Sequence, residues 1–180
     1  INILGTNDAA VLSADTANLT ETDAALSTSG TLTISDVDSA ATFVAQTGTV
    51  GSYGSFSIGT DGAWTYTASS AHNEFVAGTT YTDTFNVVSA DGTPTTVTIN
   101  IAGTNDAPVI AGAGNTISYT EQAAAVVIDA ALTVADPDNA NLTGATVTIS
   151  NGFQTGDALA ATVTGTSITA SYDAATHVLT

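Results

Sequence analysis

The sequence predicts an all-β protein made of tandem antiparallel β-sandwiches that are joined by short linkers. Thr, Val, Ile, Tyr and Phe alternate with polar residues along most of the chain, as they do in half-buried strands. Gly, Asp and Asn interrupt this alternation at intervals of roughly eight to twelve residues, which is the spacing of turns in sandwiches. The stretch INILGTNDA at residues 1–9 returns as INIAGTNDA at residues 99–107. The alternation therefore predicts strands, and the recurrence predicts more than one domain.

A hairpin and two long strands are expected in the first sandwich. Residues 56–58 and 64–66 flank an Asp-Gly turn, in which glycine allows the positive φ of a tight hairpin. Residues 89–94 form a second turn between the two long strands. Each long strand places three apolar side chains on one face: Tyr81, Phe85 and Val87 on the first, and Val97, Ile99 and Ile101 on the second.

The recurrence divides the chain into four parts. Residues 1–7 are expected to be the closing strand of a preceding repeat, 8–102 a complete sandwich, 103–108 a linker and 109–180 a second sandwich. A period of about 100 residues is the length of an ordinary domain and too long for a solenoid repeat. Nothing in the second sandwich matches the two strands that close the first, so it is expected to lack its last strands. Its strands are expected at residues 116–119, 126–128, 145–150, 160–164, 167–172 and 177–180.

The charge of the chain is entirely one-sided. It carries 17 acidic residues and no Lys or Arg, for a formal net charge of -17. Without basic side chains it cannot neutralise phosphates, which argues against nucleic-acid binding and against anionic membrane surfaces. No apolar run approaches the length of roughly 20 residues that a membrane helix requires. Clustered carboxylates in such a chain must be solvated, protonated or bound to a cation.

Oxygen-bearing side chains recur more regularly than the apolar ones. In both copies the Asn-Asp pair is followed by a glutamate and, 15 positions after that glutamate, by an Asp-x-Asp. Calcium prefers roughly six to eight oxygen ligands in flexible geometry, so we expect these groups to meet at one pole of a sandwich and to bind Ca²⁺. The alternative is that they form hydrogen-bonded turns and keep loops soluble. The candidate ligands are Asn7, Asp8, Glu21, Asp36, Asp38, Asn105, Asp106, Glu121, Asp136 and Asp138.

Several of these segments resemble the VCBS-type and cadherin-like repeats of giant bacterial adhesins of the RTX type, which are exported by type I secretion. The similar segments are GTNDAPVI at 103–110, LTETD at 19–23, residues 30–38, YGSF at 53–56, DGAWTY at 61–66 and residues 85–92. The resemblance covers nearly all of residues 5–110, whereas residues 111–180 share only the Glu and Asp-x-Asp positions. It implies Ig-like sandwiches, calcium at their junctions, an extracellular or cell-surface location and a role in adhesion or biofilm matrix.

The leading hypothesis is a structural extender, in which calcium at the linkers stiffens tandem repeats of a bacterial cell-surface or secreted adhesin. Its partners would be neighbouring repeats, with glycans as a further candidate. The alternative is a self-assembling extracellular filament or matrix subunit, in which residues 1–4 of one identical chain complete the second sandwich of the next. An enzyme is not expected, because no motif suggests a cleft that could hold a substrate.

Two aromatic and two histidine residues have alternative interpretations. Trp64 and Tyr66 lie on one strand face and could form a sugar-binding platform, but a Trp on an inner sandwich face more often belongs to the core. His72 and His177 fall in different repeats, so a paired histidine metal site is not expected. His72 is expected to close a loop.

Overall fold

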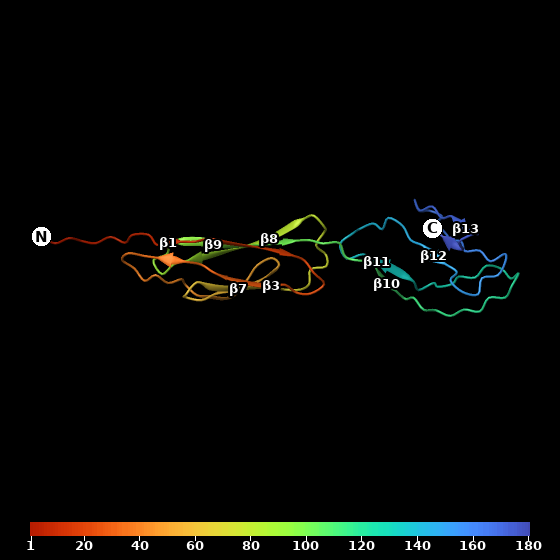
Figure 1. The fold of residues 1–180 in the computed structure, drawn as a ribbon, viewed down its shortest axis with the longest axis horizontal. Helices are drawn as coiled ribbons and strands as arrows, with labels where there is room; N and C mark the ends of the chain where they lie inside the picture. Colours follow the sequence, from red (N-terminus) through yellow and green to blue (C-terminus); the bar gives the residue numbers. More distant parts are fainter. The chain divides into compact units, whose positions relative to one another are not determined.

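A computed structural model describes residues 1–180 and contains strands but no helix (Figure 1). The chain forms two compact units, residues 1–138 and residues 139–180. The all-β prediction is therefore confirmed. Because the structure has no helix, none is long and apolar enough to span a membrane.

One layer of the larger unit is a four-stranded antiparallel sheet in the order β3-β7-β6-β5. Its strands are β3 (Ser27–Thr31), β5 (Gln46–Val50), β6 (Gly54–Ile58) and β7 (Ala63–Ala68). The predicted hairpin is β6–β7, and Gly62 in its turn has a φ of 84°. A shift of register between Gln46 and Thr49 interrupts the outer strand β5.

The second layer has three strands in the order β2-β9-β8. They are β2 (Asp15–Thr20), β8 (Thr80–Val88) and β9 (Pro94–Ala102). The two long strands β8 and β9 pair antiparallel, but β2 runs parallel to β9. Parallel strands end at the same edge of a sheet, so β2 and β9 both finish at the pole where the linker begins. The strand β1 (Val11–Leu12), which precedes β2 in the chain, pairs antiparallel with β4 (Ile34–Ser35), which follows β3.

The hydrophobic core lies between the two layers. The rings of Phe56 on β6 and Phe85 on β8 stack across it, with centroids 4.7 Å apart. Trp64 and Tyr66 are 2% and 1% exposed, which confirms the core interpretation and excludes a surface sugar platform formed by these rings. Each fully buried large side chain contributes roughly 1.5–3 kcal/mol of transfer free energy to folding. The core comprises Leu32, Phe43, Phe56, Ile58, Trp64, Tyr66, Ala68, Phe75, Phe85, Val87, Val97, Ile99 and Ile101.

Residues 103–138 extend the larger unit beyond the sandwich. Their only strands are β10 (Val109–Ala111) and β11 (Thr133–Ala135), which pair antiparallel. The strands predicted at 116–119 and 126–128 are absent. In the first repeat β2 depends on β9 for its long ladder, and residues 116–119 have no corresponding strand beside them in this chain. Strand-forming composition alone does not produce a strand without a pairing partner.

The smaller unit contains one three-stranded antiparallel sheet in the order β12-β14-β13. The strands β12 (Val147–Thr148), β13 (Tyr172–Asp173) and β14 (Val178–Leu179) are each two residues long. The predictions at 145–150 and 177–180 are thus met only in part, and 160–164 forms no strand. The strand expected at 167–172 is reduced to its last residue, because most side chains of this unit remain exposed and no packed face supports longer strands.

Candidate metal centre

The parallel pairing of β2 with β9 creates an acidic site at the end of the sandwich. Glu21 directly follows β2, and its backbone N–H donates to the carbonyl of Ala102, the last residue of β9, at 2.8 Å. The linker that leaves β9 then carries Asp106 past the same pole. We call this end of the sandwich the linker pole and define it by Glu21, Asp23 and Asp106.

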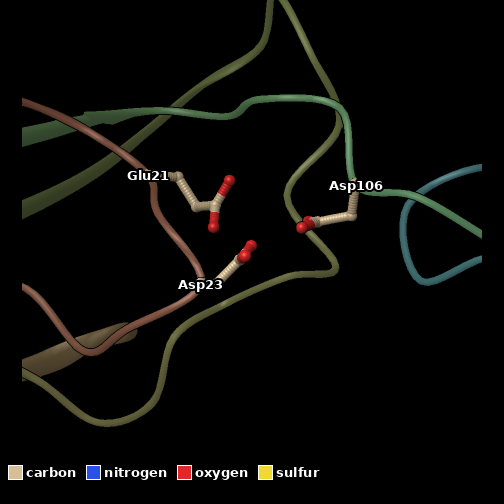
Figure 2. Close-up of side chains that lie close together, drawn as sticks. All are labelled: Glu21, Asp23 and Asp106. Atoms are coloured by element: carbon tan, nitrogen blue, oxygen red, sulfur yellow. The ribbon is translucent and has the colours of Figure 1, made fainter.

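Three carboxylates converge at the linker pole. One ligand oxygen from each of Glu21, Asp23 and Asp106 lies within 4.8 Å of the others, and Figure 2 shows the three side chains directed toward a common space. Glu21 is 2% exposed and Asp106 is 8% exposed, whereas Asp23 lies at the surface. Two buried acids and one exposed acid therefore line a single site.

The oxygens of this site are only partly satisfied by the protein. The Thr104 hydroxyl donates to Glu21 Oε2. Glu21 Oε1 and Asp106 Oδ2 are buried and accept no hydrogen bond. A buried carboxylate oxygen without a partner is costly, and a cation is the group that removes this cost from several such oxygens at once. The residues present therefore fit a bound metal ion.

The electrostatics at Asp106 also favour a bound cation. Burial raises the pKa of Asp106, and the hydrogen bond with Asp23 and the negative charges of Glu21, Asp23 and Asp138 raise it further. The chain has no Lys or Arg that could neutralise the cluster. Hard oxygen ligands of this kind suit calcium or magnesium better than softer metals.

The following Asp-x-Asp turn lies against the linker. The backbone N–H of Asp106 donates to Asp138 Oδ1 at 3.3 Å, and the N–H of Asp138 donates to Asp136 Oδ1 at 3.2 Å. The side-chain amide of Asn105 donates to the Asp106 carbonyl at 2.9 Å. Asp136 directly follows β11, as the sequence predicts for a strand end. Asp138 thus lies beside Asp106, and Asn105 and Asp136 belong to the same hydrogen-bonded turn.

The remaining predicted ligands of the first repeat lie at the opposite end of the sandwich, the entry pole. There the N–H of Asp8 donates to Asp38 Oδ2 at 3.1 Å and the N–H of Asp38 donates to Asp36 Oδ1 at 3.0 Å. Asn7 donates to the Asp8 carbonyl at 3.1 Å. These bonds repeat those of Asn105, Asp106, Asp136 and Asp138, so the recurring letters encode a recurring turn.

The expectation that Glu21 meets Asp36 and Asp38 at one pole is therefore corrected. The strand β2 runs between the entry pole and Glu21, and a strand advances about 3.3 Å per residue. The six residues of β2 thus keep Glu21 far from Asp36 and Asp38. Glu21 instead joins the Asp106 of the second copy of the motif. Glu121 is exposed and lies outside the cluster.

Asp23 belongs to the cluster but is not among the predicted ligands. The prediction relied on residues that recur between the two copies, and the second copy has Ala123 after Glu121 where the first has Asp23 after Glu21. The sequence signal that could have identified Asp23 is its position two residues after Glu21, in a Glu-x-Asp motif.

The fold and the acidic pole define a structural β-sandwich repeat with a candidate cation site beside its linker. The chain belongs to the family of the bacterial cadherin-like domain, whose family model matches residues 7–103, more than half of the sequence. A comparison with curated proteins gave no match. The family indicates an extracellular, adhesin-type structural domain.

Proposed function

We propose that this chain is a structural extender of a bacterial cell-surface or secreted adhesin, in which calcium at the linker pole stiffens the connection between repeats. The observation that carries the proposal is the pair of buried, unpartnered oxygens on Glu21 and Asp106. One belongs to the sandwich and the other to the linker. A cation shared by both would tie the linker to the sandwich.

The chain's own residues explain how such a site controls stiffness. Without a cation, Glu21, Asp23 and Asp106 carry like charges within 4.8 Å and repel one another. Repulsion favours a linker that moves away from the pole. A bound calcium ion would supply positive charge, and Glu21, Asp23 and Asp106 would hold it, with Asp136 and Asp138 as neighbouring oxygen donors. Calcium accepts irregular sets of protein oxygens, whereas magnesium demands near-ideal octahedral geometry and retains its waters, so calcium is the preferred ion.

The free energy that calcium binding can add to folding limits the role of the ion in this chain. Extracellular calcium sites have dissociation constants of about 10⁻⁴–10⁻³ M. Even a free calcium concentration of 100 times Kd stabilises a one-site protein by only about 2.7 kcal/mol. The thirteen residues of the hydrophobic core include none of the candidate ligands. Calcium would therefore tune linker stiffness and stability and would not be needed to create the fold.

Paired thermal melts of the purified chain test this proposal. The melts are recorded in chelator and in millimolar calcium, with equal magnesium as the ion control, for the wild type and for Asp106→Ala. We expect calcium, and not magnesium, to raise the Tm of the wild type, by at most the equivalent of about 2.7 kcal/mol. Asp106→Ala should lose most of this rise because it removes the linker's ligand.

Two results would contradict the proposal. The absence of any calcium-specific rise in the wild type would remove the ligand assignment. An Asp106→Ala variant that loses the same stability in chelator and in calcium would make Asp106 a turn residue, because its role would then be independent of the ion.

The wider biological setting is supported by the sequence resemblance and by the family. A role in adhesion or biofilm matrix and export by type I secretion follow from that resemblance and belong to the proposal, with glycans as a further candidate partner. Exchange of strands between identical chains stays a prediction. Residues 1–4 are exposed and form no ladder, which is compatible with either a preceding repeat or a neighbouring chain as their partner.

A further inference from the structure

A buried histidine closes the loop between β7 and β8. His72 is only 7% exposed, and its backbone has a φ of 63°, in the left-handed region that non-glycine residues rarely adopt. Its ring stacks on Phe75 at a centroid distance of 4.5 Å. A residue held in an uncommon backbone conformation usually has side-chain contacts that keep it there.

Both ring nitrogens of His72 face hydrogen-bond acceptors. Nδ1 lies 2.7 Å from Glu74 Oε1, and Nε2 lies 2.7 Å from the backbone carbonyl oxygen of Tyr53. Neither an ionised carboxylate nor a carbonyl can donate a proton. Either neutral tautomer would place one nitrogen lone pair against an oxygen lone pair at this distance. The Ser69 hydroxyl lies 3.2 Å from Nε2, but it donates to the Tyr53 carbonyl oxygen at 3.0 Å, as the Ser69 backbone N–H does at 2.9 Å. Turning that hydroxyl toward Nε2 would still leave the nitrogen lone pair against the Tyr53 oxygen at 2.7 Å.

We propose that His72 is a doubly protonated clip, which fastens the 69–76 loop to the turn at Tyr53 and releases it when the imidazolium loses a proton as the pH rises. Only the imidazolium donates to both acceptors. His72 is the one side chain of the sandwich that can carry positive charge, because the chain has no Lys or Arg and His177 lies in the other unit.

The groups that surround the clip favour the charged ring. Glu74 comes from the same loop, Asp83 comes from β8, and the ring of Tyr53 comes from the turn before β6. Burial by itself lowers the pKa of His72. The hydrogen bond to Glu74, the bond to the Tyr53 carbonyl and the charges of Glu74 and Asp83 outweigh burial and raise the pKa above its ordinary 6.5. The His72 hydrogen bond in turn lowers the pKa of Glu74.

Asp83 anchors the turn that receives the clip. Its buried carboxylate accepts the backbone N–H groups of Ser52 at 2.6 Å and Tyr53 at 3.0 Å. The turn is thereby held against β8 independently of His72. The Ser69 backbone N–H and hydroxyl also donate to the Tyr53 carbonyl, at 2.9 Å and 3.0 Å, so the start of the loop stays attached as well. When the clip opens, the part that is released is therefore the loop beyond Ser69.

The clipped loop supports the linker. The N–H of Gly103, the first linker residue, donates to the Thr79 carbonyl at 2.9 Å. A Cβ added at Gly103 would lie 2.5 Å from the Val76 carbonyl oxygen and 2.6 Å from that of Phe75, so the linker backbone packs directly on this segment. Opening of the clip would loosen the surface from which the linker leaves the sandwich. This consequence does not depend on a bound cation.

The sign of the pH dependence follows from proton linkage. The folded chain holds the His72 proton more tightly than the unfolded chain, whose histidine has the ordinary pKa of 6.5. The clip's contribution to stability is therefore fully present below pH 6.5 and is lost as the pH rises through the folded pKa. Carboxylate ligands for a cation have the opposite dependence, because they require deprotonation.

Imidazole NMR of the metal-free wild-type chain tests the protonation state directly. A pH titration of the ring ¹⁵N shifts is recorded in chelator, with His72→Gln and His177→Gln used to assign the two histidines. We expect both nitrogens of His72 to have imidazolium shifts below pH 6.5 and a titration midpoint above 6.5. A midpoint at or below 6.5, or a neutral-tautomer pattern below pH 6.5, would overturn the proposal.

Stability measurements separate a charged clip from a merely packed side chain. Gln can donate to one acceptor but never carries charge, so His72→Gln should be less stable than the wild type below pH 6.5. The difference should shrink as the pH rises through the midpoint measured by NMR. His177→Gln is the matched control and should show no such convergence. A His72→Gln deficit that is independent of pH would show a structural role only.

Discussion

Glu21 and Asp106 are candidate ligands because of hydrogen bonds that their carboxylates do not receive. Each has a buried carboxylate oxygen with no hydrogen-bond donor, and the chain has no Lys or Arg to provide one. Asp91 shows the contrast at the other end of the sandwich. Its carboxylate is held by Ser89, Thr93 and the backbone N–H of Ala10, and these hydrogen bonds depress its pKa far below the ordinary value. We therefore interpret Asp91, whose carboxylate oxygens accept hydrogen bonds from the protein, as a turn residue. Glu21 and Asp106, each with a buried oxygen that accepts none, are candidate ligands.

Asp23 offers a residue-scale prediction because it is the exposed member of the cluster. Asp23→Asn removes one of three like charges that lie within 4.8 Å. We expect it to raise the Tm in chelator slightly, because repulsion falls, and to reduce the calcium-induced rise, because a charged ligand is lost. Thermal melts in chelator and in calcium measure both effects.

Glu121→Gln is the matched control, since it removes the same charge from an exposed acid outside the cluster. It should leave the calcium-induced rise unchanged. Should Glu121→Gln reduce the rise as much as Asp23→Asn, the site would include Glu121 and the three-carboxylate assignment would have to be extended.

At the scale of the elements, the direction of β2 relative to β9 has the largest consequence for the candidate site. The β2–β9 ladder is parallel, and it alone places the end of β2 beside the linker. The β6–β7 hairpin has a different role, because its turn packs into the core. The Gly62 carbonyl accepts the N–H of Leu32 at 2.9 Å, and the turn covers the ring of Phe43. The hairpin turn is therefore a packed element and not a free loop.

A pair of glycine substitutions tests this difference between turns. Gly62 and Gly92 have similar φ values of 84° and 90°. A Cβ at Gly62 would collide with the Leu32 carbonyl oxygen and lie 2.8 Å from the Phe43 ring, whereas a Cβ at Gly92 would meet nothing within 4 Å. Gly92→Ala should cost about 1–2 kcal/mol for the left-handed backbone. Gly62→Ala should cost about 1–3 kcal/mol more, from overpacking.

Urea unfolding of the two alanine variants and the wild type measures these costs. Gly92→Ala is the control for backbone strain without a contact. Equal losses of unfolding free energy would mean that the core relaxes around the new methyl group, and the packed-turn interpretation would then be wrong.

At the scale of the whole molecule, the distribution of charge separates the sheet faces from the poles. The outward face of β2-β9-β8 is polar but uncharged: the Thr82 hydroxyl donates to Asn100 at 2.8 Å and Asn100 donates to Asn18 at 2.9 Å. Apart from Asp15 in β2 and the buried Asp83 in β8, the acids of the sandwich lie in its turns and at its two poles. With a formal charge of -17, the chain repels itself, and it does so most strongly where acids cluster.

Self-repulsion predicts a dependence on simple salt. In chelator, adding sodium chloride should raise the Tm, because the screening length falls from about 10 Å at 0.1 M to about 3 Å at 1 M. Calorimetry across a salt series measures the effect. Calcium at matched ionic strength should stabilise the chain beyond this screening curve. A Tm that does not change with salt would show that the folded chain is not strained by its net charge.

Local pattern was sufficient to predict much of the sandwich. Alternation identified the core faces of β8 and β9, and Asp-Gly identified the β6–β7 turn, because both are properties of adjacent residues. The same reasoning failed at residues 116–119, where a strand requires a partner that neighbouring letters cannot reveal. Strand propensity therefore predicted a tendency, and pairing decided whether it was realised.

The sequence by itself determined that this is an acidic all-β chain with recurring oxygen ligands and no basic residue to neutralise them. Only the tertiary structure decided which acids meet. Because β2 runs parallel to β9, Glu21 and Asp23 face Asp106 of the second motif and not Asp36 and Asp38 of their own. The physical reason is that residue spacing and composition are local properties, whereas a cation site depends on the direction of strands that lie far apart in the chain.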